Sequence, residues 1–169
     1  MKYVKYSLVG GVLCMILLLT SSYTTRTSGI SEGINPGNMI PDFELKQDSV
    51  QGIRLSDLRG QKILISLWAA YDADSHMKNL LLWNSLQKEG FPVKMISISF
   101  DLSKSIFEKT LDMDGISKES QYIDIAGKKS EIYRKCQLAK KGFNNFLVDE
   151  NGVIVATNLT PKKLERLLN

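Results

Sequence analysis

The apolar run at residues 63–68 constrains the fold of this chain more than any other feature. Ser66 is the polar exception between Ile63 and Trp68. A strand of this composition has to be buried on both faces, because a strand with one face in water alternates polar and apolar residues. A second β-rich run covers residues 93–100. Helices usually cover such strands on both sides, so the sequence predicts an α/β fold.

Segments with apolar residues at helical spacing separate and follow these strands. One helix is predicted to begin at Ser75 and to end near Gly90, with a broad apolar face and solvated lysines opposite it. Further helices are predicted over residues 103–111, 130–138 and 161–168. Because strands and helices alternate along the chain, we expect a mixed sheet between two helical layers.

Two pairs of short β-rich runs predict hairpins. Residues 43–45 and 53–55 flank a turn that contains Gly52, which predicts an N-terminal β-hairpin. Residues 146–148 and 153–156 flank a turn with an Asn-Gly pair, which is a strong hairpin signal. A further short strand is predicted over residues 121–125.

The N-terminal segment has the composition of an export signal. Lys2 and Lys5 precede an apolar run at residues 7–19, which is shorter than the roughly 20 residues that span a membrane. We therefore interpret residues 1–22 as a signal peptide or membrane anchor, residues 23–37 as a linker, and residues 38–169 as one domain. The signal is cleaved, retained or lipidated at Cys14. All three alternatives place the domain outside the cytoplasm, in the periplasm or anchored to the membrane.

The composition excludes several classes of function. The net charge is +4, half of it from Lys2 and Lys5, and no basic stripe interleaves with aromatic residues. Nucleic acid is therefore not an expected partner, and the membrane is expected only through the N-terminal segment. No glycine-rich phosphate-binding pattern occurs, so no cofactor is predicted.

Four segments in a fixed order carry a family resemblance. They are residues 37–45, 55–61, 146–154 and the turn Leu67-Trp68-Ala69-Ala70-Tyr71. Together they resemble the thioredoxin-like superfamily, and more narrowly the exported thiol–disulfide oxidoreductases and the alkyl hydroperoxide reductase/thiol-specific antioxidant (redoxin) group. The resemblance covers residues 37–168. It implies a thioredoxin-like three-layer α/β/α sandwich with a mixed central sheet and an N-terminal β-hairpin.

The catalytic residues that the resemblance implies are absent from this sequence. The two cysteines of the Cys-x-x-Cys pair fall on Asp72 and Ser75, so dithiol–disulfide exchange is not expected. The family's cis-proline falls on Phe143 or Asn144, where we expect an ordinary trans bond. A thiol peroxidase loop, with Pro and Thr before the cysteine, is also missing. We expect Asp72, Asp74 and Ser75 to cap the following helix.

The resemblance leaves a binding role as the main hypothesis. Aromatic and acidic residues near the former active site are predicted to bind a protein or peptide partner through an exposed surface. The alternative is that Trp68 and Phe143 belong to the core. The candidate binding residues are Trp68, Tyr71, Asp72, Asp74 and Phe143.

Cys136 is the one cysteine within residues 38–169, so no internal disulfide is possible there. One interpretation is a small buried apolar side chain on a helix. A second is a reactive thiol, activated by neighbouring cations such as Arg134 and Lys135, which would support an oxidoreductase or antioxidant activity. A third is an intermolecular disulfide.

His76 is the only histidine and forms an Asp-x-Asp-x-His pattern with Asp72 and Asp74. Residues in a strand-to-helix turn point in different directions, so we do not predict a metal site. Ser75 and His76 point about 100° apart on a helix, which excludes a shared catalytic proton. We expect His76 to be a solvated surface residue, and Asp101 to be a turn or cap residue.

Overall fold

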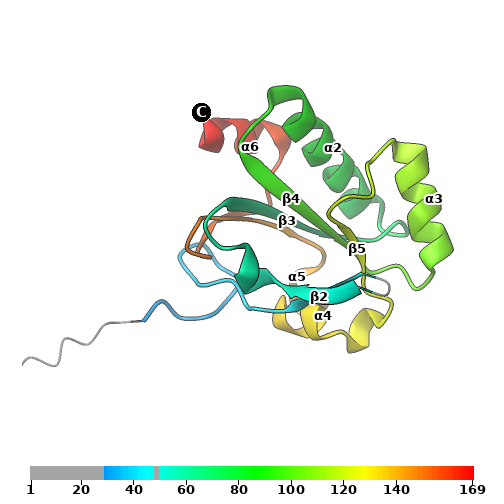
Figure 1. The fold of residues 1–169 in the computed structure, drawn as a ribbon, viewed down its shortest axis with the longest axis horizontal. Helices are drawn as coiled ribbons and strands as arrows, with labels where there is room; N and C mark the ends of the chain where they lie inside the picture. Colours follow the sequence, from blue (N-terminus) through cyan, green and yellow to red (C-terminus); the bar gives the residue numbers. More distant parts are fainter. Residues whose placement is uncertain (1–28, 48–49) are drawn as a thin grey trace, which may run out of the picture.

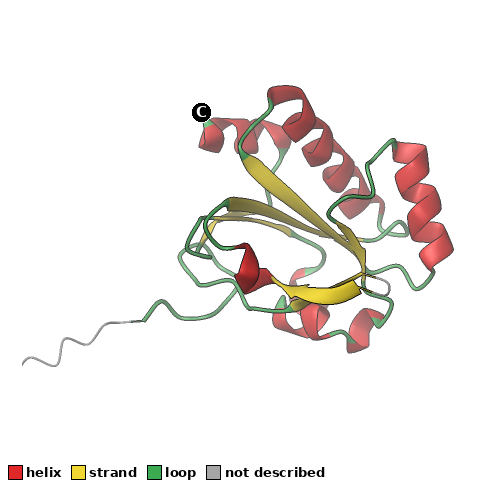
Figure 2. Cartoon of the chain, in the orientation of Figure 1, coloured by secondary structure: helices red, strands yellow, loops and turns green. Residues whose placement is uncertain are grey.

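The computed structural model of this chain describes residues 29–47 and 50–169. The predicted signal segment at residues 1–22 and the first part of the predicted linker lie outside these residues. Figures 1 and 2 show the fold, coloured by sequence and by secondary structure. The elements are β1 (Glu44–Gln47), β2 (Val50–Arg54), the 3₁₀ helix η1 (Leu55–Leu58), β3 (Lys62–Trp68), α2 (Ala73–Glu89), β4 (Val93–Ser99), α3 (Lys104–Asp114), β5 (Gln121–Ile123), the 3₁₀ helix η2 (Gly127–Lys129), α4 (Glu131–Lys135), α5 (Leu138–Lys141), β6 (Asn145–Val148), β7 (Ile154–Thr157) and α6 (Pro161–Leu168).

The central sheet is mixed, as predicted. Its strand order is β5-β4-β3-β6-β7. The pairs β3–β4 and β4–β5 are parallel, whereas β3–β6 and β6–β7 are antiparallel. The parallel strands β3 and β4 need a crossover connection, which α2 provides. The β1–β2 hairpin forms a separate two-stranded antiparallel sheet.

Alternation along β3 divides the core between the two faces of the sheet. Ile63, Ile65 and Leu67 pack on the side of the β1–β2 hairpin, α4 and α5. Leu64 packs on the opposite side with residues of α2 and α6, and Trp68 packs there beside α3. Figure 1 shows α2, α3 and α6 above the sheet and α4, α5 and β2 below it. These layers confirm the thioredoxin-like sandwich.

Local sequence determines where the long helices begin and end. The side chains of Asp72, Ser103 and Thr160 cap α2, α3 and α6 by accepting a hydrogen bond from a backbone N–H in the first turn. Helix α2 ends at Gly90, whose φ of 64° lies in the left-handed region that glycine adopts at low cost. Among the described residues, no helix combines the length and the apolar character needed to cross a bilayer.

The single helix predicted over residues 130–138 is wrong. The chain forms two short helices there, because Gln137 adopts a left-handed conformation with φ of 55° and interrupts the first of them. The break lets Ile132, Cys136 and Leu138 enter the same core cluster. Upstream, Ile34 is buried in that cluster as well, so packing begins before residue 38, the predicted start of the domain.

Candidate functional site

The tetrapeptide Asp72-Ala73-Asp74-Ser75 lies at the junction between β3 and α2. Asp72 is the N-cap of α2, and its Oδ1 accepts a hydrogen bond from the Ser75 N–H at 2.9 Å. The Ser75 hydroxyl donates to the Asp72 carbonyl at 3.1 Å and accepts from the Ala69 N–H at 3.4 Å. Asp72 and Ser75, the positions that the resemblance assigns to the family's cysteines, are therefore held by hydrogen bonds within the helix start and the preceding turn.

The two carboxylates of the tetrapeptide differ in environment. Asp72 is half-buried and faces the helix start, whereas Asp74 is exposed and forms an ion pair with Lys78 at 2.8 Å, one turn along α2. An anionic group at a helix N-terminus is favoured by the free N–H groups and the helix dipole. The predicted capping role is confirmed for Asp72 and is wrong for the side chains of Asp74 and Ser75, which bond Lys78 and the preceding turn instead.

The variant Asp72→Ala is expected to lower the free energy of unfolding by about 1 kcal/mol, because the Ser75 N–H loses its acceptor. Asp74→Ala is the matched control and should cost less than about 0.5 kcal/mol, since its exposed ion pair is screened by water. Urea unfolding followed by circular dichroism measures both. Equal losses for the two variants would contradict the capping role of Asp72.

Trp68 is not a surface residue, which corrects its assignment as a binding residue. Its side chain is 0% exposed. The indole Nε1–H donates to the Ser97 hydroxyl at 2.7 Å, and that hydroxyl donates to Asn79 Oδ1 at 2.9 Å. Its ring also packs 6.3 Å from that of Phe107. Trp68 therefore joins β3 to β4, α2 and α3, and it is unavailable to a partner.

The aromatic surface near the junction consists of Tyr71 and Phe143. Tyr71 is 70% exposed, and its ring meets the half-buried ring of Phe143 edge-on at a centroid distance of 6.1 Å. Phe143 in turn packs 5.7 Å from Phe100, which anchors it to the core. The sequence therefore placed Tyr71 and Phe143 together correctly.

The loop that contains Phe143 and Asn144, where the resemblance predicts the family's cis-proline position, lies beside the same junction. The carbonyl of Asn144 accepts a hydrogen bond from the Leu67 N–H at 2.9 Å, and the Asn144 side chain accepts from the Asn145 N–H. All peptide bonds within the described residues are trans. The backbone at Asn144 is thus joined to β3 directly.

Asp101 has a larger role than the turn or cap that the sequence predicts. It is 3% exposed, and both of its carboxylate oxygens accept from the Ala70 N–H, at 3.1 and 3.0 Å. The Ser99 hydroxyl donates to it at 2.7 Å. Asp101 thus holds the turn that presents Tyr71. The feature of the sequence that could have indicated this role is an acidic residue directly after a buried strand. That strand, β4, is parallel to β3 and ends beside it.

His76 is half-buried rather than solvated. Its Nε2 lies 2.6 Å from Asp114 Oδ2, across 38 residues of sequence, and its ring stacks on Trp68 at 5.4 Å. Asp72 and Asp74 bind other partners, so the Asp-x-Asp-x-His pattern does not converge. Within residues 29–47 and 50–169, no cluster of three or more His, Cys, Asp or Glu side chains is arranged to hold a metal ion.

Cys136 is 1% exposed and lies in the core at the C-terminal end of α4, before α5 begins. Burial raises the pKa of its thiol to about 12, and the nearby charge of Lys135 lowers it only in part. At neutral pH the thiol is therefore protonated and shielded from solvent. This environment matches the interpretation of Cys136 as a small buried apolar side chain.

A cavity of about 750 Å³ lies away from this junction, along β5. Its lining includes residues of β1, α3, β5 and α4, but none of the predicted binding residues. No motif in the sequence indicated it, because the elements that line it are far apart along the chain.

Comparisons with known proteins identify the family. No protein-family model matches the sequence. The chain is 25% identical over 180 residues to the thioredoxin-like protein YneN of Bacillus subtilis, covering 98% of each chain. The crystal structure of a thioredoxin-like protein from Parabacteroides distasonis is 38% identical, with a TM-score of 0.70 over 82% of this chain and 98% of that one.

A third comparison extends the likeness of fold. The thioredoxin domain of a thiol-disulfide oxidoreductase from Bacteroides vulgatus is 17% identical and has a TM-score of 0.66, over 81% of this chain and 100% of that one. At that identity the match shows the fold alone, whereas the Parabacteroides match is close enough to show kinship. The chain therefore belongs to the thioredoxin-like family, whose fold it shares with thiol–disulfide oxidoreductases.

Proposed function

We propose that this protein is an exported thioredoxin-like protein that has lost dithiol exchange and acts by binding a protein or peptide partner. The observation that carries the proposal concerns the two positions that the resemblance assigns to the family's cysteines: Asp72 caps α2, and the Ser75 hydroxyl bonds the preceding turn. Asp72 and Ser75 bond each other and the turn before them, and neither is a thiol. The thiolate chemistry of the family has no equivalent atom at this junction.

Binding is proposed at the surface formed by Tyr71, Asp72, Asp74 and Phe143. Tyr71 contributes a large exposed aromatic side chain on a turn that Asp101 holds from beneath. Aromatic residues on rigid supports contribute much of the binding energy at protein interfaces. The adjacent carboxylates favour a partner segment that carries basic or hydrogen-bond donor groups.

Export is proposed from the basic start and apolar run of the N-terminal segment. The alternative function is a single-thiol oxidoreductase activity of Cys136. The burial of that side chain argues against it, because a reactive thiol has to be accessible.

Two measurements on the full-length protein test this proposal. Insulin disulfide reduction should not exceed the rate of the reductant alone, and an enzymatic rate would contradict the loss of dithiol exchange. For binding, a photoreactive benzoylphenylalanine replaces Tyr71 in cells that express the protein. Discrete cross-linked products are expected from position 71. The same probe at Met113, which is 77% exposed on α3, is the control. Identical products from both positions would exclude a specific surface at Tyr71.

A further inference from the structure

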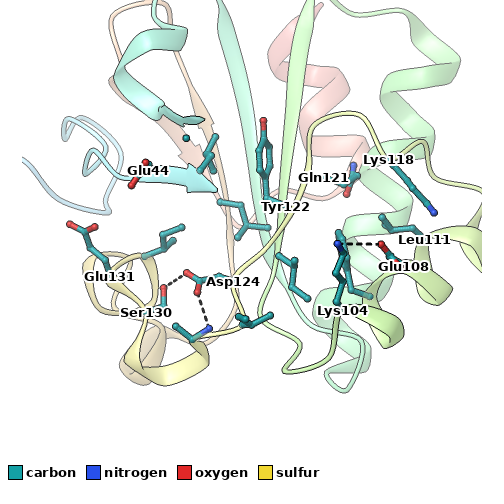
Figure 3. A pocket seen from close by; sticks show the side chains of 18 of the residues that line it. Glu44, Lys104, Glu108, Leu111, Lys118, Gln121, Tyr122, Asp124, Ser130 and Glu131 are labelled. Atoms are coloured by element: carbon teal, nitrogen blue, oxygen red, sulfur yellow. Dashed lines mark hydrogen bonds and ion pairs between the residues drawn. The ribbon is translucent and has the colours of Figure 1, made fainter. Parts of the chain in front are cut away.

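The cavity beside β5 reaches both faces of the sheet. Its lining includes Phe107 and Leu111 of α3 on one face, and Leu45 of β1 and Ile132 of α4 on the other. Figure 3 shows these two sides, with Gln121, Lys118 and Lys104 across the cavity from Glu44, Asp124 and Glu131. The cavity thus lies along β5, which is an edge strand of the five-stranded sheet.

Gln121 contributes an unsatisfied amide to this cavity. The residue is 3% exposed, and neither its Nε2 nor its Oε1 has a hydrogen-bond partner among the described residues. Leaving a buried amide unpaired costs free energy that folding alone does not recover. An amide that both donates and accepts is matched by another amide or peptide group.

The backbone of β5 presents a second set of polar groups, which face no paired strand among the described residues. Ser97 donates its N–H to the Ser120 carbonyl, and Asp124 donates its N–H to the Ser99 carbonyl. In a parallel pair, alternate residues direct both backbone groups toward the neighbouring strand, so Tyr122 faces β4. Ile123 therefore directs its N–H and C=O to the outer edge. Within residues 29–47 and 50–169, no strand pairs with that edge.

The charges around the cavity do not select a charged ligand. Three lysines and four carboxylates line it. Several of them are engaged with each other or with nearby residues: Lys104 with Glu108 at 3.9 Å, Lys118 with Asp112 at 3.4 Å, Glu131 with Lys135 at 3.0 Å, and Asp124 with the Ser130 hydroxyl. What the lining offers to a ligand is apolar surface and amide-type hydrogen bonds.

We propose that this cavity binds an extended peptide segment of a partner protein, which adds to the outer edge of β5 as a further strand. Ile123 bonds the peptide backbone, and the Gln121 side chain bonds a peptide group of the same segment. Side chains of an extended strand point alternately to opposite faces. Apolar residues at successive positions would therefore contact Phe107 and Leu111 on one side, and Leu45 and Ile132 on the other. This site is independent of the surface around Tyr71.

Titration of the ¹⁵N-labelled full-length protein with blocked pentapeptides tests this proposal. The peptides are acetylated, amidated and carry Val or Leu at successive positions, so that both faces of the strand are apolar. Chemical-shift changes are expected at the Ile123 backbone amide and the Gln121 side-chain amide, and hydrogen exchange of the Ile123 N–H should slow on binding. The same peptides with an N-methyl group on every residue keep their side chains but lack the backbone donors, so they should bind at least about tenfold more weakly.

Two variants distinguish the contribution of the Gln121 amide to peptide binding from that of the charged residues in the lining. Gln121→Leu keeps a similar volume and should weaken peptide binding about tenfold. Lys129→Gln removes a cation from the same lining and should leave binding within about twofold, since exposed charges contribute little. The N-methylated peptides test the proposal on the unmodified protein if Gln121→Leu does not fold.

Four outcomes would overturn the proposal. The first is the absence of any shift at β5 with the whole peptide set, and the second is equal binding of the N-methylated peptides. The third is a set of shifts confined to Tyr71 and Phe143, which would place peptide binding at the surface of the proposed function instead. The fourth is a concentration-dependent shift of Ile123 in the free protein, which would make a second copy of this chain the occupant.

Discussion

Cys136 in the folded protein should react with DTNB about a thousandfold more slowly than in the unfolded chain. Its pKa is raised to about 12 by burial, whereas an ordinary cysteine has a pKa near 8.5. The thiolate is the reacting species, and at pH 7.5 this difference reduces the thiolate fraction by about three orders of magnitude. Burial of the side chain to 1% exposure adds a steric barrier.

The experiment uses a Cys14→Ser background, so that Cys136 is the only thiol in the chain. Native and urea-unfolded samples are compared at pH 7.5, and native samples are then followed upward in pH. The native rate should keep rising above pH 9, where the unfolded rate levels off because its thiol is already ionised. Labelling of the native protein within seconds would contradict this prediction and support the interpretation of Cys136 as a reactive thiol.

The same raised pKa makes folding stability depend on alkaline pH. A thiol with a higher pKa in the folded state binds more protons there than in the unfolded chain, between the two pKa values. Its contribution to stability is therefore complete below about pH 8 and falls as the pH rises from about 8.5 toward 12. Cys136→Ala should lack this part of the pH dependence.

Trp68→Ala should lower the free energy of unfolding by about 3–5 kcal/mol. The substitution empties a fully buried site between β3 and α3, and it removes the indole N–H that the Ser97 hydroxyl accepts. It also removes the ring on which His76 stacks. The loss is comparable to a large part of the stability of a domain of this size, so measurement by urea unfolding is best made at low temperature.

Tyr71→Ala is the matched control, since it removes an aromatic side chain three residues away. Tyr71 is 70% exposed, and its loss should cost about 0.5 kcal/mol or less. Trp68→Phe should fall between the two, because it keeps most of the ring but leaves Ser97 without its donor. A small effect of Trp68→Ala would contradict its place in the core.

Variants of Trp68 and Tyr71 therefore distinguish an effect on folding stability from an effect on partner binding. Trp68 stabilises the frame, and Tyr71 is the residue to test in partner binding. A Tyr71 variant that folds normally and loses cross-linking would assign the effect to the surface itself. The corresponding experiment with Trp68 could not distinguish lost binding from lost folding.

Features that depend on local sequence were predictable. The unbroken apolar run of β3 requires cover on both faces, and it correctly indicated the sandwich. The caps at Asp72 and Ser103 follow from side chains that bond the backbone three residues ahead. The break at Gln137 was not predictable in this way, because a non-glycine residue with positive φ is chosen by the packing of its neighbours.

The sequence alone determined the fold class and the position of the Asp-Ala-Asp-Ser tetrapeptide, because both follow from the order and periodicity of short segments. Only the tertiary structure decided which of the candidate residues are accessible. The burial of Trp68 and Cys136, the pairing of His76 with Asp114, and the unpaired amide of Gln121 all depend on segments distant in the chain. Solvent exposure and hydrogen-bond partners are properties of the packed molecule, so no local pattern encodes them.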